Sequence, residues 1–332
     1  MFTIFSNIFS SVILLLESLL LSDILPPIFL VTLLLSPYIL LRLRVFSRAA
    51  LGNAPQRPNQ LTYIDLAAAL FIALATPFIF VIFTRRADIL SSIVDLAVAA
   101  FIVFVLSARF TDGRRGLGIS VPGKMQAVGF GVLLYMAVMP WLIIVEVVSA
   151  IAQKTLLHEK NQMHPVLKQI EHAHSPMQIL SLVVMICIIA PIAEELFFRG
   201  LLQTLLIRGI AIWRRKDSKV TEAKAGERAA GIVIAAAIFA AVHLTVINDA
   251  WSWLPALFLL GVTLGYAYER TGKLWADITI HALFNAFAVS LIIFGHVGQP
   301  PAGRSPVHNG PAPSKMHSIG AASAGERHVT FG

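Results

Sequence analysis

The sequence predicts an all-α fold: a polytopic integral membrane protein with about eight transmembrane helices and a buried polar site. The first reason is composition, since 57% of the 332 residues are hydrophobic and only 13% are charged, with a mean hydropathy of +0.78. Soluble domains carry about 25% charged residues. A chain with so few charges cannot cover itself with polar surface, so we expect lipid to solvate it.

The second reason is a series of apolar runs, each close to the roughly 20 residues that cross a bilayer as a helix. They lie at 24–41, 61–83, 88–108, 125–150, 176–207, 230–247, 253–269 and 275–296. Residues 1–22 are also apolar, but they lack the basic start and the small-residue cleavage site of a signal peptide. We expect a retained helix there, and Glu17 leaves open whether it spans the membrane or lies at the interface.

The third reason is the placement of charge. The net charge is +8, and the basic residues gather in alternate loops, at 42–57, 109–124, 208–228 and 270–273. Short loops rich in Lys and Arg stay on the cytoplasmic side, so we expect these four loops there and the tail after residue 296 on the opposite side. The positive charge therefore sets topology, implies the lipid bilayer as a partner and excludes nucleic acid.

These patterns divide the chain into four regions. Residues 1–60 hold N-terminal hydrophobic helices and a basic loop, residues 61–175 accessory transmembrane helices and a polar loop, and residues 176–296 a transmembrane core. Residues 297–332, rich in Pro, Gly, Ala and Ser, are expected to be disordered. The polar loop contains His158, His164, His172 and His174. Their spacing matches no compact metal motif, so we expect a polar loop with an interfacial helix.

One turn of the core concentrates charge in an otherwise apolar stretch. Glu194, Glu195 and Arg199 follow a run from Met177 to Ala193 that has no charge. A charged side chain at the centre of a transmembrane helix costs about 2.5 to 3.5 kcal/mol on insertion scales. Glu195 and Arg199 are four residues apart and can pair on one helix face. Glu194 is rotated away from that pair and stays free for another role.

Two later spans supply further polar side chains, His243 in one and His281 with Asn285 in the other. His281 and Asn285 share a helix face because they are four residues apart. At about 1.5 Å per residue, Glu194 and His243 both lie roughly 20 Å from the cytoplasmic ends of their spans. We therefore expect these groups to converge in one cavity open to the cytoplasm. Asp65 and Asp277 lie near span ends and are interpreted as helix-start or interface groups.

This set of groups suits hydrolysis by an activated water molecule. A buried carboxylate can act as a general base and an imidazole can relay the proton, while a second imidazole and an amide can donate hydrogen bonds to an oxyanion. No Ser or Cys stands beside the motifs as a nucleophile, and Cys187 lies in an apolar run. Two histidines and a glutamate can equally hold zinc, but no His-Glu-x-x-His pattern is present, so the residues leave metal dependence open.

The motifs resemble those of the CPBP family, the CAAX protease and bacteriocin-processing group of intramembrane endopeptidases, also called the ABI family. Glu-Glu-x-x-x-Arg matches Glu194, Glu195 and Arg199, Phe-x-x-x-His matches Phe239 and His243, and His-x-x-x-Asn matches His281 and Asn285. All three occur in order, each inside a predicted span. The resemblance covers about residues 176–296.

The resemblance implies a membrane protease with a buried site that is reached from the cytoplasm. If the family's residue roles apply here, Glu194 activates water and His243 assists it. His281 and Asn285 stabilise the oxyanion. Glu195 and Arg199 position the site. The resemblance favours a metal-free glutamic protease with no cofactor, and zinc is the alternative. The substrate would be a peptide or protein in or at the membrane, either a prenylated CAAX tail or another peptide. The compact loops suggest a prokaryotic cytoplasmic membrane.

Two other hypotheses remain at the level of sequence. The first is a non-catalytic protein on the same scaffold, which binds a membrane peptide or confers bacteriocin immunity. The second is a proton-coupled transporter, since buried Glu, His and Arg also form proton relays. The complete motif set argues against the first, and the lack of repeated halves argues against the second.

Overall fold

The computed structural model describes residues 25–45, 47–83, 87–153, 155, 175–244 and 253–295. The retained helix expected over residues 1–22, the four-histidine loop and the disordered tail lie outside these described residues. The predicted division into four regions likewise stays a prediction.

The regular elements of the described residues are helices, which confirms the all-α class. Each predicted apolar run coincides with a helix. The run 176–207 lies within a longer helix, Pro176–Arg215, and the bounds of the other runs agree with those of their helices within a few residues. These other helices are α2 (Leu25–Arg42), α4 (Tyr63–Phe83), α5 (Ala87–Phe104), α6 (Lys124–Ala152), α11 (Ala225–Leu244), α12 (Trp253–Thr271) and α13 (Leu274–Gly295). The short α3 (Arg48–Gly52) and the 3-10 turn η1 (Leu106–Arg109) lie between them.

One long helix carries the glutamates and is built from five successive segments. They are α8 (Pro176–Val184), η3 (Met185–Ile189), α9 (Ala190–Glu195), η4 (Leu196–Gln203) and α10 (Thr204–Arg215). It begins at Ser175, whose hydroxyl accepts a hydrogen bond from Gln178 N at 3.2 Å, and Pro176 occupies the first turn. The segments η3 and η4 are π-helical, and they flank the short α-helical stretch that ends at Glu195. Such wider turns often occur at functional sites.

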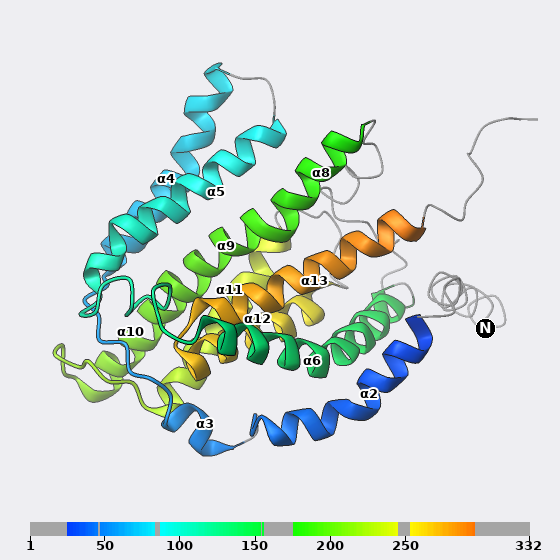
Figure 1. Cartoon of the computed structure of the whole chain (residues 1–332). Helices are drawn as coiled ribbons and strands as arrows, with labels where there is room; N and C mark the ends of the chain where they lie inside the picture. Colours follow the sequence, from blue (N-terminus) through cyan, green and yellow to red (C-terminus); the bar gives the residue numbers. More distant parts are fainter. Residues whose placement is uncertain are drawn as a thin grey trace, which may run out of the picture. The chain divides into compact units, whose positions relative to one another are not determined.

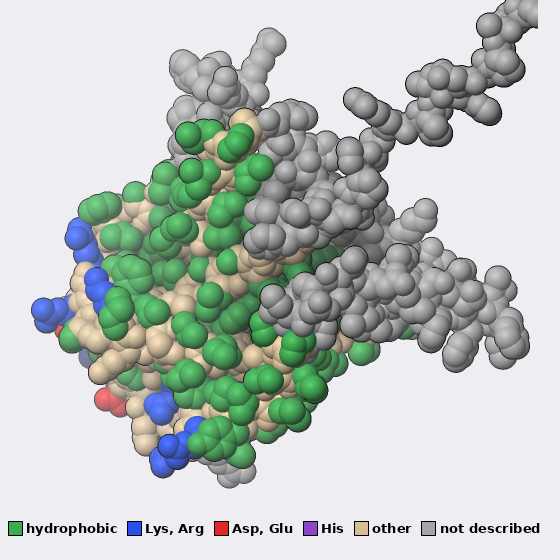
Figure 2. Space-filling model, turned by 45° about the vertical axis from the view of Figure 1, so that its right-hand side comes forward, with side chains coloured by type: hydrophobic (Ala, Val, Ile, Leu, Met, Phe, Trp, Pro, Cys, Tyr) green, Lys and Arg blue, Asp and Glu red, His purple; other side chains and the backbone are tan. Residues whose placement is uncertain are grey.

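Four helices of the described residues are long and apolar enough to cross a membrane: Lys124–Ala152, Pro176–Arg215, Ala225–His243 and Leu274–Leu291. Shorter apolar helices cover Pro27–Arg42, Tyr63–Ala73 and Leu96–Arg109. A polytopic integral membrane protein is therefore supported, while the count of eight spans stays a prediction. In Figure 2 hydrophobic side chains cover most of the visible face, and Lys and Arg gather toward one side of it. Apolar surface of this extent suits contact with lipid.

The helices that carry the polar motifs pack closely around α12. This helix contacts α11, α6 and α13, and α13 in turn lies against both α6 and the long helix (Figure 1). Small residues permit the close approach. A Cβ on Gly261 of α12 would lie 3.0 Å from Ala236 Cα of α11, and one on Gly131 of α6 would lie 2.5 Å from Ala276 O of α13. This packing brings the three motif-bearing helices to one place.

Candidate active site

The pair expected from the spacing of Glu195 and Arg199 is present and fully enclosed. The exposed fractions of the two residues are 0% and 1%. Arg199 Nη1 donates to Glu195 Oε1 at 3.2 Å, and Arg199 Nε lies 3.1 Å from Glu195 Oε2. Arg199 Nη2 donates to the carbonyl oxygen of Gly261 at 3.3 Å. Buried charges persist when they are paired and hydrogen-bonded, so this pair fixes the long helix against α12.

His281 links the two successive glutamates. Its Nδ1 lies 2.7 Å from Glu195 Oε1, and its Nε2 lies 3.8 Å from Glu194 Oε2. An ionised carboxylate only accepts hydrogen bonds, so Nδ1 is the donor to Glu195 and Nε2 is directed toward Glu194. The Glu194 side chain keeps 31% of its surface exposed, whereas that of Glu195 has none. The two neighbouring carboxylates thus have different environments and share one imidazole.

Phe239 packs the second motif against this group. Its ring centroid lies 4.7 Å from that of His243 and 6.0 Å from that of His281, and the Arg199 guanidinium carbon lies 4.7 Å above it. His243 Nδ1 lies 2.8 Å from the carbonyl oxygen of Phe239. A carbonyl oxygen accepts, so Nδ1 is the donor and Nε2 is the ring nitrogen that remains for a ligand. Phe239 thus contacts the rings of both His243 and His281, and it connects the second motif to the third.

Asn285 takes a different position from the one its expected role suggests. Its Nδ2 donates to the carbonyl oxygen of Ile186 at 2.8 Å, within the π-helical segment η3. This bond ties α13 to the long helix just before the glutamates. One of the two amide hydrogens is thereby occupied, and the other is left for a ligand.

Asp277 belongs to this site, although the sequence did not indicate it. Asp277 lies in the first turn of α13, as a helix-start group should, but its side chain also has 0% exposure and lies close to Glu195 and Arg199. The available signal was its spacing, four residues before His281 and hence on the same face. For Asp65 the same interpretation is confirmed: its carboxylate accepts from the Thr62 N–H at 2.7 Å at the start of α4.

The described residues contain no preassembled metal site. Within the part of the chain that the structure describes, no three His, Cys, Asp or Glu side chains are grouped to hold a metal ion. His243 and His281 both use Nδ1 for hydrogen bonds within the protein and keep Nε2 for a ligand. Zinc-binding histidines have the same arrangement, so these two bonds leave the question of a metal open.

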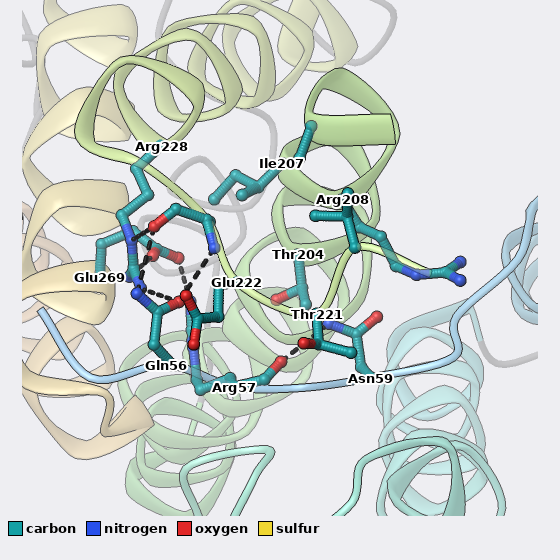
Figure 3. Close-up of a pocket in the computed structure, with 13 residues that line it drawn as sticks. Gln56, Arg57, Asn59, Thr204, Ile207, Arg208, Thr221, Glu222, Arg228 and Glu269 are labelled. Atoms are coloured by element: carbon teal, nitrogen blue, oxygen red, sulfur yellow. Dashed lines mark hydrogen bonds and ion pairs between the residues drawn. The ribbon is translucent and has the colours of Figure 1, made fainter. Parts of the chain in front are cut away.

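A second buried ionic cluster lies further along α12, around Glu269 (Figure 3). The Glu269 carboxylate pairs with Arg57 through Oε1 and with Arg228 through Oε2, the latter at 2.5 Å. The Arg57 guanidinium also lies 3.7 Å above the Tyr268 ring. Burial acts to lower the pKa of Arg57, but the neighbouring Glu269 carboxylate outweighs it and raises the pKa, so Arg57 stays charged. Arg57, Arg228 and Glu269 border a pocket with about 400 Å³ of empty space, part of it open to solvent.

Gln203 connects this cluster to the glutamates. It lies one turn after Arg199, and its Nε2 donates to Gly265 O and to Glu269 Oε1, both at 3.2 Å. Gly265 permits this approach, because a Cβ there would lie 2.5 Å from Gln203 Oε1. Arg199 and Gln203 therefore bond to successive turns of α12, and a continuous polar contact runs along the interface of the two helices.

Comparison with known proteins identifies one match. Residues 176–287 match the family model described as type II CAAX prenyl endopeptidase Rce1-like. The matched segment runs from the start of α8 into α13 and includes all six predicted site residues. No curated protein and no solved structure matches the chain.

Proposed function

We propose, from the match of residues 176–287 to the Rce1-like CAAX prenyl endopeptidases of the CPBP family, that the chain is an intramembrane endopeptidase. In the proposed mechanism no metal takes part and Glu194 activates water. The main support for this mechanism is the difference between the two glutamates. Glu195 is enclosed and bound by Arg199 and His281, while Glu194 keeps an exposed edge and faces the Nε2 atom of the same imidazole. Two carboxylates held in different environments are typical of divided roles in catalysis.

The first step assigned to the site is water activation. Glu194 accepts a proton from a bound water, and the resulting hydroxide attacks the carbonyl carbon of the peptide bond. Glu195 holds His281 by its Nδ1–H, so the ring keeps its Nε2 directed at Glu194 through the reaction. Arg199 keeps Glu195 in place and remains outside the chemistry itself.

The second step is breakdown of the tetrahedral intermediate. The carbonyl oxygen gains the electron pair of the attacked C=O bond, and hydrogen bonds from the free amide hydrogen of Asn285 and from a protonated His281 stabilise it. When the C–N bond breaks, the leaving nitrogen takes up the proton that Glu194 received from water. We assign the relay of that proton to the Nε2 atom of His243, since its Nδ1 is engaged with the Phe239 carbonyl oxygen.

The substrate proposed is a membrane-associated peptide, with prenylated CAAX-type tails as the first class to test. The family match and the apolar surface in Figure 2 support this class. The basic loops support a site that is reached from the cytoplasmic side of a prokaryotic membrane.

The test is cleavage of a quenched prenylated peptide by the full chain purified in detergent. Wild type is compared with Glu194→Gln, and Glu222→Gln, the same change at an exposed residue, is the control. We expect cleavage by wild type and by the control, no effect of a chelator, and loss in Glu194→Gln with peptide binding retained. Cleavage that a chelator abolishes and zinc restores would overturn the metal-free mechanism. Binding without cleavage by wild type, across prenylated and unprenylated peptides, would favour the non-catalytic hypothesis.

A further inference from the structure

Asp277 is a buried carboxyl group with few hydrogen-bond donors. Its side chain has 0% exposure, and neither Oδ1 nor Oδ2 has a hydrogen-bond partner among the described side chains, although its own backbone N–H is close by. An ionised carboxylate in this state is costly, because its lost hydration is poorly replaced. A neutral carboxylic acid avoids most of that cost and also becomes a donor.

The charges around Asp277 also favour a neutral carboxylic acid. Asp277, Glu194 and Glu195 bring three carboxyl groups to a site with one guanidinium, that of Arg199. Neighbouring carboxylates that share a buried site cannot all be ionised. The described neighbours on other elements do not change this. Tyr268 on α12 adds no positive charge, and Arg57 is already paired with Glu269.

The proton is best assigned to Asp277 by comparing the partners of the acids. Both oxygens of Glu195 face positive or hydrogen-bonding groups, namely the Arg199 guanidinium and the His281 ring. Asp277 interacts with Glu195 itself and has no comparable donor. Helix α6 also packs against this turn of α13, where its Gly131 lies against Ala276 and Thr279. Gly131 has no side chain and so brings no charge or donor.

We propose that Asp277 is a positioning residue that holds a proton in the resting protein and donates it to Glu195. The resulting carboxyl–carboxylate pair fixes Glu195 as the acceptor for His281 Nδ1, and so sets the direction of Nε2. The protonation of Asp277 stands apart from the reaction, while its effect on catalysis rests on the proposed function.

The direct test is infrared spectroscopy of the full chain in lipid, which detects the C=O stretch of a protonated carboxylic acid without any substrate. The wild-type spectrum at neutral pH should contain a component of this band that is missing in Asp277→Asn. Subtracting the two spectra isolates it from any other carboxylic acid, such as the partly buried Glu146 in α6. Asp65→Asn is the matched control. Asp65 is also a buried aspartate in a first helical turn, but it pairs with Arg109 at 3.0 Å, so its loss should leave the band unchanged. A band that is the same in wild type and in Asp277→Asn would refute the proposal.

If the variant does not fold, the infrared band of the wild-type protein alone provides a second test. The band should shift when the solvent is exchanged for D₂O and should disappear when the pH is raised. Glu195→Gln should move its frequency, because the acceptor changes from a carboxylate to an amide. An unchanged frequency would show that the proton is not shared with Glu195.

The catalytic consequence is tested by the pH profile of cleavage. In wild type, kcat should fall at alkaline pH for two reasons: His281 loses the proton that stabilises the oxyanion, and Asp277 loses the shared proton, which places a second negative charge beside Glu195. In Asp277→Asn, whose amide donates at every pH, the second contribution should be missing, so that the pH profile changes while KM stays unchanged. An unaltered profile with uniformly lower activity would indicate a purely structural role. A clear infrared band in a protein that cleaves no peptide would refute the proposed function and leave the protonation of Asp277 standing.

Discussion

The glutamate site and the Glu269 cluster are both buried and ionic, and both lie along the interface of the long helix with α12, yet they differ in how far their carboxylate oxygens are satisfied. In the Glu269 cluster both carboxylate oxygens are bound by guanidinium groups and Gln203 adds a further donor, although Arg57 Nη1 and Gln203 Oε1 have no partner among the described groups. In the glutamate site, Glu194 Oε2 and both oxygens of Asp277 lack hydrogen-bond partners among the described groups, and Glu195 Oε2 has its ion pair with Arg199. Satisfied buried polar groups hold structure together, and perturbed, unsatisfied ones mark sites prepared for chemistry. Substitutions should therefore separate stability from activity.

Glu194→Gln should have the largest effect, and on activity alone. Loss of a general base lowers kcat by about 10² to 10⁴-fold. The change is isosteric, and Glu194 approaches its partner His281 only to 3.8 Å, so stability should hardly change. Cleavage kinetics and thermal unfolding in detergent, measured on the same sample, check this. A large loss of stability in this variant would place Glu194 with the structural cluster instead.

Glu269→Gln should show the opposite behaviour. It leaves Arg57 and Arg228 buried without a carboxylate, and breaking such an ionic group costs about 3 to 5 kcal/mol of stability. Denaturant-induced unfolding measures the loss, and Glu222→Gln at the exposed edge of the same pocket is the control. The folded fraction of Glu269→Gln should retain cleavage per molecule. Complete inactivity of that folded fraction would contradict the separation.

Gly265→Ala tests the connection between the two regions. Its Cβ would lie 2.5 Å from Gln203 Oε1 and 3.1 Å from Ile232 Cγ2, so Gln203 must move and its bond to Gly265 O is strained. Overpacking of this kind costs about 1 to 3 kcal/mol. Gly129→Ala is the matched control, because nothing lies within 4 Å of its added Cβ. Equal unfolding temperatures for the two variants would show that Gln203 adapts without cost.

Tyr268→Phe should have the smallest effect. The hydroxyl donates to the carbonyl oxygen of Leu117 at 3.0 Å, and losing one such buried bond costs about 1 kcal/mol. The ring beneath Arg57 is kept, so the Glu269 cluster stays assembled. Thermal unfolding measures the shift. A loss as large as that of Glu269→Gln would mean that the hydroxyl, and not the ion pairs, holds this cluster.

Sequence alone predicted what depends on local spacing. The pairing of Glu195 with Arg199 follows from four residues of helix, and the positions of the helices follow from long apolar runs. The meeting of Glu195 with His281 rested on matching motifs to a family, because the two residues are 86 positions apart. That contact is present in the structure.

What sequence missed depends on tertiary packing. Arg57 and Arg228 were interpreted only as topology signals in loops, since no periodicity relates them to Glu269, which is 212 positions from Arg57. Asp277 had a sufficient local explanation at a helix start, and that explanation concealed its contact with Glu195. The two π-helical segments also have no signature in the apolar run that contains them.

The π-helical segments have a consequence for how the long helix tolerates a change in length. Each residue of a regular helix advances it by about 1.5 Å and rotates it by about 100°. Deleting one residue such as Leu202 from η4 would tend to restore a regular helix and re-phase everything beyond it. Thr204 and Arg208, which now bond to Arg199 O and Leu61 O, would then face other neighbours. In this stretch the number of residues matters as much as their identity, because removing one residue rotates the C-terminal half of the helix.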